Sequence, residues 1–276
     1  MPKSIFMRYP NGLSKALTLS YDDGVWDDVR MVETLDRHGI KCTFNVNSGR
    51  YAAEDVSTAH TRMSGRQVTE LLKNSPHEVA VHALEHPFLA AQPAATVCYE
   101  VLQDRLNLEK QFGRIVRGMA YPMGSFSDTV VECLRCCGIA YARTTVSTEK
   151  FDLPTDWLRM PATCRHRDPK LMELANRFLS LKVKDFPKLF YLWGHTYEFS
   201  DENNWNVIEE FAELMGNRED IWYATNGELY DYINDFERLV WSADETIVHN
   251  PSARTLYFAY GSQIVEIGAG ETKTLV

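Results

Sequence analysis

Short β-forming runs alternate with amphipathic helical segments along most of this chain, and this alternation limits the folds that are open to it. The first β-forming run, residues 16–21, is followed by helical spacing of apolar residues from 27 to 38. Further strands are expected at residues 41–46, 78–82, 116–120, 139–143, 189–193 and 221–224. Helices are expected at residues 64–73, 94–112, 128–137, 169–181, 204–215 and 226–240. Repeated strand–helix units of this kind favour a parallel barrel or a doubly wound sheet.

The first strand is not followed by a glycine-rich phosphate-binding loop, which argues against a dinucleotide-binding fold. We therefore expect an α/β architecture, a distorted or incomplete (β/α) barrel, over residues 1–243. Within it, Ser64 and Asn226 are the expected N-caps of the helices that follow them.

The pattern changes after Trp241, where short β runs are separated by Asn-Pro, Tyr-Gly-Ser and Gly-Ala-Gly turns. Residues 244–276 should form a small antiparallel β appendage. Its alternating apolar residues predict one buried face: Ile247, Leu256, Phe258, Ile264 and Ile267. That face must pack on the barrel or pair with a second copy in a homodimer, because a few isolated strands are marginal in water.

The charge of the chain limits its partners. The 276 residues include 38 acidic and 29 basic ones, a net charge of −9, and no basic run interrupts this excess. We expect no nucleic-acid or membrane partner, and small or neutral substrates. No stretch approaches the roughly 18 apolar residues of a membrane span, and the N-terminus lacks a secretory signal. A cytoplasmic location, with the six cysteines as reduced thiols, is therefore expected.

Three groups of polar residues follow predicted strands, where barrel active sites are built. Residues 20–24, Ser-Tyr-Asp-Asp-Gly, place two adjacent carboxylates after the first strand, although an Asp-Asp-Gly turn capping a helix would read the same way. His82 and His86 are four residues apart, within reach of one metal ion, or are a pair of surface histidines. His195 ends the 189–193 run and could be a general acid or a structural histidine.

Taken together, these residues indicate a catalytic metal centre. An aspartate and two histidines make a three-ligand site with open positions for water and substrate, and a second aspartate and a distant histidine can supply base and acid. Imidazole ligands suit a divalent ion, zinc first, with cobalt, nickel or iron as alternatives.

The order and spacing of the motifs resemble those of the polysaccharide deacetylase family, also called carbohydrate esterase family four. The family motif Thr-Phe-Asp-Asp-Gly corresponds to residues 20–24, and His-Ser/Thr-x-x-His corresponds to residues 82–86. Its Arg-Pro-Pro-Tyr-Gly motif corresponds to residues 120–124, Ala-Tyr-Pro-Met-Gly, and its last histidine to His195. The resemblance covers roughly residues 15 to 230 and implies a distorted, incomplete (β/α) barrel.

The resemblance also implies a role for each matched residue. Asp22 would be the general base, and Asp23, His82 and His86 would hold the metal. The backbone N–H of Met123 would help to form the oxyanion hole, and His195 would protonate the leaving amine.

Two departures from the family pattern bear most on the site. The arginine of the third motif falls at Ala120, so Arg143, Arg159 or Arg165 would have to replace it from another strand. Ala83 stands where the family has Ser or Thr. Further residues near the motifs are candidates for substrate binding: Tyr121, Trp157, Arg159, His166 and Trp193, with Tyr197 and Trp205 as further parts of an aromatic wall.

The sequence therefore predicts a metal-dependent hydrolase of a non-peptide carbon–nitrogen bond. N-deacetylation of an amino sugar or a related small amide is the leading interpretation. A cyclic imide or ureide hydrolase on the same scaffold is one alternative. A non-catalytic metal- or sugar-binding protein is another.

Overall fold

The first predicted strand is buried along its whole length, as expected for a strand covered on both faces by the rest of a parallel fold. In the computed structural model, which describes residues 4–275, all eight residues of β2 (Lys15–Asp22) are buried. β2 lies inside a nine-stranded sheet with the order β7-β6-β5-β4-β3-β2-β9-β8, and β10 also pairs with β2. Every pairing in this sheet is parallel.

The sheet curls into an open, distorted barrel, as the sequence predicted. β7 and β8 lie at the two ends of the strand order, yet only Thr163 separates them in the chain. The remaining strands of the sheet are β3 (Cys42–Val46), β4 (Glu78–Val81), β5 (Gly118–Ala120), β6 (Tyr141–Ser147), β7 (Met160–Ala162), β8 (Cys164–Arg165), β9 (Lys188–His195) and β10 (Trp222–Tyr223).

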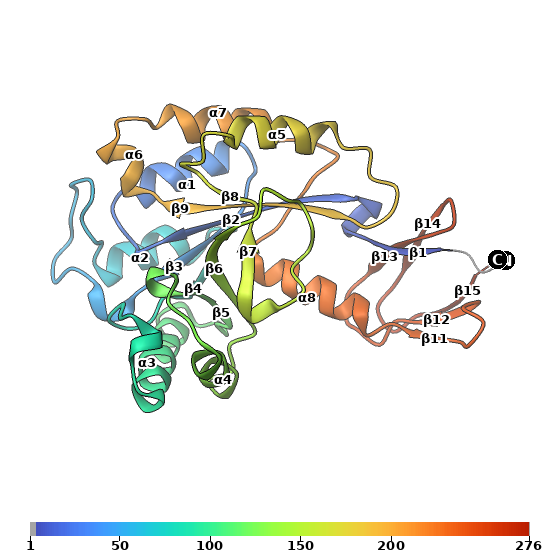
Figure 1. The fold of residues 1–276 in the computed structure, drawn as a ribbon, viewed down its shortest axis with the longest axis horizontal. Helices are drawn as coiled ribbons and strands as arrows, with labels where there is room; N and C mark the ends of the chain where they lie inside the picture. The colour runs from blue at the N-terminus through green and yellow to red at the C-terminus, as the bar shows by residue number, and fades with distance from the viewer. Residues whose placement is uncertain (1–3, 276) are drawn as a thin grey trace.

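Helices flank the sheet on both sides. In Figure 1, α1, α5 and α7 lie together on one side, and α3 and α4 lie on the other. The helices are α1 (Asp28–Arg37), α2 (Gly65–Leu72), α3 (Ala94–Phe112), α4 (Asp128–Cys136), α5 (Leu171–Ser180), α6 (Tyr197–Asp201), α7 (Asn206–Met215) and α8 (Asn226–Glu237). Short 3-10 turns add η1 (Pro10–Gly12), η2 (Ser48–Arg50), η3 (Leu89–Ala91), η4 (Pro122–Gly124) and η5 (Trp157–Arg159).

Local signals explain where two of these helices begin. Ser64 caps α2 in a capping box with Gln67, as expected. The expected cap of α8, Asn226, is wrong by one residue. Thr225 is the cap, because its side chain accepts from the Glu228 N–H while the Glu228 carboxylate accepts from the Thr225 N–H.

The register between β2 and β9 positions the functional residues. The two strands pair from Lys15 opposite Lys188 to Asp22 opposite His195. On the other side of β2, Asp22 lies opposite Asn45 of β3. Because parallel strands end at the same edge of a sheet, these polar residues meet at one mouth of the barrel.

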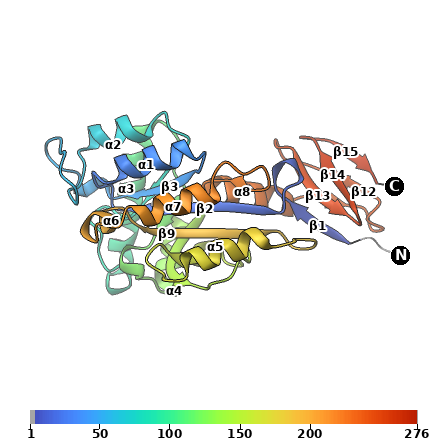
Figure 2. The ribbon, with the colours of Figure 1, turned by 90° about the horizontal axis from the view of Figure 1, so that it is seen from above.

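The C-terminal strands belong to two antiparallel three-stranded sheets, β1-β13-β14 and β11-β12-β15, the first of which includes the N-terminal strand β1. They lie at one end of the molecule beside α8 (Figure 2). Their bounds are β1 (Ile5–Arg8), β11 (Val240–Trp241), β12 (Ile247–His249), β13 (Leu256–Tyr260), β14 (Gln263–Ile267) and β15 (Thr272–Thr274). β1 and β11 precede residue 244, so the two sheets include strands from outside the predicted appendage. The division of the chain into two domains stays a prediction.

The appendage packs on the barrel through a shared hydrophobic cluster. Leu256, Phe258 and Ile267 are fully buried there with Tyr232 and Ile233 of α8. The Tyr232 hydroxyl donates to the carbonyl of Arg8 at 2.7 Å and so ties the helix to β1. This contact covers the apolar face within a single copy of the chain.

Two of the residues expected on the buried face are exposed. Ile264 is 54% exposed and Ile247 is 43% exposed. Ile264 and Ile267 are three residues apart in one strand and therefore face opposite sides of the sheet. Val248 is the residue of β12 that is buried instead of Ile247.

Two predictions from the sequence concern membrane-spanning helices and the state of the cysteines. Within residues 4–275, no helix combines the length and apolarity that crossing a bilayer requires. All six cysteines are free thiols.

Phe258→Ala should lower the free energy of unfolding by about 3–5 kcal/mol, because it empties a buried aromatic site. Urea denaturation followed by circular dichroism measures this. Ile264→Ala on the neighbouring strand is the matched control and should change stability much less. Equal losses for the two variants would contradict this packing of the appendage.

Candidate metal centre and active site

Two adjacent aspartates reach one cavity because the backbone turns sharply after β2. Side chains of consecutive strand residues normally point to opposite faces. Here Asp23 has φ 90° and Gly24 φ 65°, so the chain leaves the strand at Asp23. Asp22 and Asp23 consequently line the same cavity of about 450 Å³. A positive φ at a residue with a side chain is strained, and such strain is typical of functional sites.

The histidine motif lies in a loop after β4 that is held from two sides. Asn47 donates to the carbonyls of His82 and Ala83, the latter at 2.7 Å. The His82 N–H donates to Asp104 of α3 at 3.0 Å. Positive φ at Ala83 and His86 shapes the loop so that both imidazoles face the cavity.

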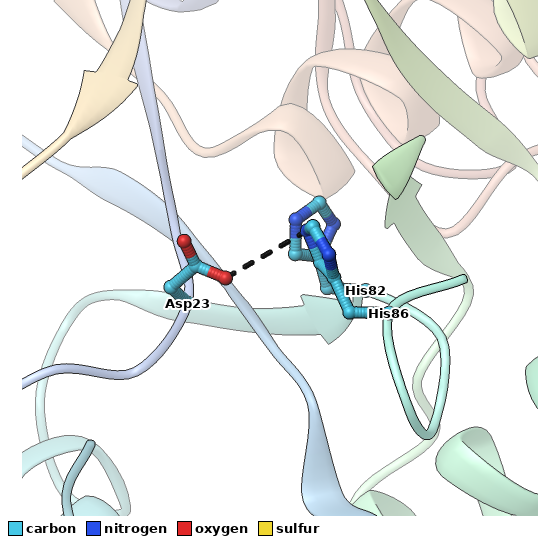
Figure 3. Close-up of side chains that lie close together, drawn as sticks. All are labelled: Asp23, His82 and His86. Carbon is cyan, nitrogen blue, oxygen red and sulfur yellow. Dashed lines mark ion pairs between the residues drawn. The ribbon is translucent and has the colours of Figure 1, made fainter. Parts of the chain in front are cut away.

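Asp23, His82 and His86 form a group that can hold a metal ion. One oxygen or nitrogen of each lies within 4.8 Å of the others. Figure 3 shows the two imidazoles side by side facing the Asp23 carboxylate, with His86 Nε2 3.8 Å from Asp23 Oδ1. His82 Nδ1 lies 2.8 Å from the carbonyl of Ala120. A neutral ring must place its proton on that nitrogen to donate there, which leaves Nε2 free as a ligand atom.

The protonation states also fit a metal. Burial lowers the pKa of His82 and brings that of His86 to about 4, against the pull of the nearby carboxylates. Burial alone would raise the pKa of Asp23, but His82 and Arg62 outweigh it and the pKa is lowered. Near neutral pH the histidines are therefore neutral and the aspartate is ionised, which are the forms that bind metal.

Asp22 is held by a buried ion pair. Arg143 Nη2 lies 2.5 Å from Asp22 Oδ2, and Asn45 Nδ2 donates to Oδ1 at 2.8 Å. Arg143 is 1% exposed, and its guanidinium lies 4.4 Å from the centre of the Trp193 ring. Burial favours the protonated acid, but Arg143 outweighs it and lowers the pKa of Asp22 to about 2.

Among the three candidate arginines, Arg143 is the one that contacts Asp22. Arg159 pairs instead with Asp156 and Asp128, both at 2.6 Å. Arg165 pairs with Glu198.

His195 lies between two carboxylates. Its Nε2 is 3.7 Å from Asp22 Oδ2, and its Nδ1 is 3.6 Å from Glu198 Oε2. Glu198 also contacts His166 Nε2 at 3.2 Å. Burial would raise the pKa of Glu198, but the nearby His166 and His195 rings, together with the charge of Arg165, lower it well below its usual range.

The remaining candidates divide between the cavity and its surroundings. Met123 has φ 55°, is 58% exposed and lines the cavity with Tyr121 and Trp193. Tyr197 also lines it. Outside the lining lie Trp157, which packs on Tyr230; Arg159, in its ion pairs; His166, stacked between Tyr21 and Phe199; and Trp205.

Arg62 and Glu198 are among the residues of the site that the sequence did not predict. Arg62 donates to Asp23 Oδ1 at 2.7 Å and to the Asp23 carbonyl at 2.6 Å, but it comes from the loop before α2 and belongs to no motif. Glu198 could have been found, since it lies three residues after His195 and such residues share a face once a helix starts there.

The fold and the site together define a class: an α/β barrel with acidic and histidine side chains converging at the carboxyl ends of its strands. Residues 9–142 match the family model for polysaccharide deacetylase. This part of the chain is therefore similar to a polysaccharide deacetylase domain, and the match includes the motifs at residues 20–24, 82–86 and 120–124.

Known proteins support this assignment to different extents. Peptidoglycan-N-acetylglucosamine deacetylase PgdA of Listeria monocytogenes is 26% identical over 140 residues. That match covers 50% of this chain and 27% of the relative's length, so this chain spans about a quarter of that relative.

Solved structures share the fold. A Mycobacterium smegmatis structure assigned to the polysaccharide deacetylases has a TM-score of 0.58 at 14% identity, covering 86% of this chain and 96% of that one. BA3943 of Bacillus anthracis, described as a CE4 family pseudoenzyme, has a TM-score of 0.50 at 19% identity, covering 84% and 70%.

Proposed function

We propose that this protein is a divalent-metal-dependent hydrolase that removes the acetyl group from the nitrogen of an amino sugar. The observation that carries the proposal is the convergence of Asp23, His82 and His86, with ligand atoms within 4.8 Å of one another, beside the Asp22–His195 pair. The family match and the listerial relative, itself a deacetylase of a peptidoglycan amino sugar, support the substrate class.

The donor set of one carboxylate and two imidazoles suits zinc, and also cobalt, nickel or iron. The chemistry that such an ion supplies is polarisation of the acyl oxygen and a lowered pKa of water in the site. Arg62 orients Asp23 as a metal ligand. It donates to Oδ1 and to the Asp23 carbonyl, and so holds the carboxylate in place.

In this proposal Asp22 accepts the proton of the attacking water. Arg143 and Asn45 fix the orientation of its carboxylate and keep it ionised near neutral pH. Asp22 would act on a water whose pKa a bound ion would lower, because an ionised carboxylate alone is a weak base. The N–H of Met123, at the mouth of the same cavity, stabilises the negative oxygen that develops on the acyl carbon.

His195 then donates a proton to the departing nitrogen. Its Nε2 faces Asp22 while Glu198 lies at its Nδ1, so the ring is oriented by carboxylates at both nitrogens. Tyr121, Trp193 and Tyr197 offer apolar ring faces in the cavity against which a sugar can pack. Glu198 is a positioning residue, since it acts through His195.

A non-catalytic binding protein is the second candidate, because a CE4 family pseudoenzyme shares the fold. The Asp22–Arg143 pair opposes it, since a binding protein needs no oriented base. Turnover of N-acetylated sugars separates the two functions.

His82→Ala and His86→Ala should each remove stoichiometric metal and acetate release while the protein stays folded, because an open catalytic site contributes less to folding than a structural one. Elemental analysis of the purified variants and circular dichroism measure this. His249→Ala in the appendage is the control and should keep its metal. Full metal content in both site variants would refute the assignment.

Asp22→Asn and Asp23→Asn should fail in different ways. Asp22→Asn should retain metal but lose about 10²–10⁴ in kcat, the usual scale for a general base. Asp23→Asn should weaken metal binding, measured by competition with a chelating dye. Identical behaviour of the two variants would show that the division of roles is wrong.

His195→Ala should impair hydrolysis of N-acetyl substrates far more than hydrolysis of an activated aryl acetate, because only the amine leaving group needs a strong proton donor. Acetate release from both substrates gives the ratio. Glu198→Gln should shift the same ratio in the same direction by a smaller factor. Equal losses on both substrates would exclude His195 as the acid.

A further inference from the structure

The charge of the cavity differs in sign from that of the chain. The sequence carries a net charge of −9. The cavity, however, is lined by three arginines, Arg50, Arg62 and Arg165, and by two carboxylates, Asp22 and Asp23. Its metal-binding histidines add no negative charge, and a bound divalent ion would add two further positive charges. A cleft with an excess of one sign attracts ligands of the other.

Two of the three arginines are already engaged. Arg62 donates to Asp23 and, at 2.9 Å, to the side-chain oxygen of Asn47. Arg165 is paired with Glu198. Arg50 differs. Its guanidinium donates a 3.4 Å hydrogen bond to the carbonyl of Glu85, and within residues 4–275 no carboxylate forms an ion pair with it.

The backbone that carries Arg50 is nonetheless tightly held. In η2 the Ser48 N–H donates to Asp104 at 2.8 Å, and the Gly49 N–H donates to the carbonyl of Leu84 at 3.1 Å. A Cβ on Gly49 would lie 2.6 Å from that carbonyl, so only glycine allows this close approach to the histidine loop. Arg50 is therefore placed at the cavity by its backbone, while its guanidinium stays uncommitted.

We propose that the substrate carries an oxyanion group, a carboxylate or a phosphate, on or next to the sugar that bears the acetamide, and that Arg50 binds this group. An arginine fork forms two parallel hydrogen bonds with either oxyanion. The inference rests on the proposed function for the amide part of the substrate, but the binding of the anion can be measured without turnover.

Three probes with the same acetamide test the proposal: N-acetylglucosamine, N-acetylmuramic acid and N-acetylglucosamine 6-phosphate. Calorimetry on the zinc-loaded protein at low ionic strength should show one or both anionic sugars binding about three- to tenfold more tightly than the neutral one. The tighter of the two anions identifies the carboxylate or the phosphate as the source. The preference should shrink in high salt, because Arg50 is exposed to solvent.

Arg50→Gln should reduce the affinity for the anionic sugars to that for the neutral sugar. Arg50→Lys should keep part of the preference, since it keeps the charge but not the fork. Arg238→Gln removes the same charge from an exposed site at the end of α8 and should leave the preference intact. Equal binding of all three sugars by the unmodified protein, or a preference that survives in Arg50→Gln, would overturn the proposal.

Acetate release is measured on the same samples. An anion preference that depends on Arg50 but comes without acetate release refutes the proposed deacetylation and upholds the anion site. Acetate release without an anion preference that depends on Arg50 refutes the anion site and upholds the proposed deacetylation.

Discussion

Two adjacent carboxylates, Asp22 and Asp23, are buried where β2 ends, and arginine side chains at the mouth of the barrel compensate their negative charge. Burying an ionised carboxylate is costly unless a counter-charge and hydrogen bonds accompany it. Arg143 reaches Asp22 from β6, and Arg62 reaches Asp23 from the loop before α2, so each acid has its own arginine. These separate partners allow neighbouring residues of one type to have different tasks. Asp22 is held beside His195, whereas Asp23 is turned toward the histidine loop.

The sequence predicted those parts of the structure that depend on local patterns. Apolar periodicity indicated most strands and helices, and the Asp-Asp and His-x-x-x-His motifs indicated which side chains would meet. It left three arginines open as the partner of Asp22, because the choice depends on how β6 lies across the sheet from β2. The role of Arg62 could not be predicted for the same reason, because its contact with Asp23 spans 39 residues and depends on the path of a loop. In the appendage, side chains alternate between the two faces of a strand, so Ile264 and Ile267 lie on opposite faces. The prediction that all five apolar residues share one face did not take this alternation into account.

The net charge of the chain does not describe the charge of the cavity lining. An overall charge of −9 favoured small or neutral substrates, yet the arginines that compensate the buried carboxylates also gather at the barrel mouth. Ion pairing at short range sets the field inside a cleft, while exposed charges farther away are screened within about 10 Å at moderate salt. An acidic protein can therefore present a cationic site, and the ligand class must be inferred from the residues that line the site.

His195 shows how this compensation extends to the acid–base groups. A continuous series of charged contacts runs from Arg143 through Asp22, His195 and Glu198 to Arg165. The imidazole stands between the two carboxylates of this series, with one near each of its nitrogens. Arg165 Nη2 lies 3.4 Å from Nδ1 of the same ring. In the function proposed above, His195 presents one nitrogen to the departing amine, so its ring has to be held in a fixed orientation. Contacts at both nitrogens supply that orientation, so the ion pairs that compensate Asp22 also position the proposed proton donor.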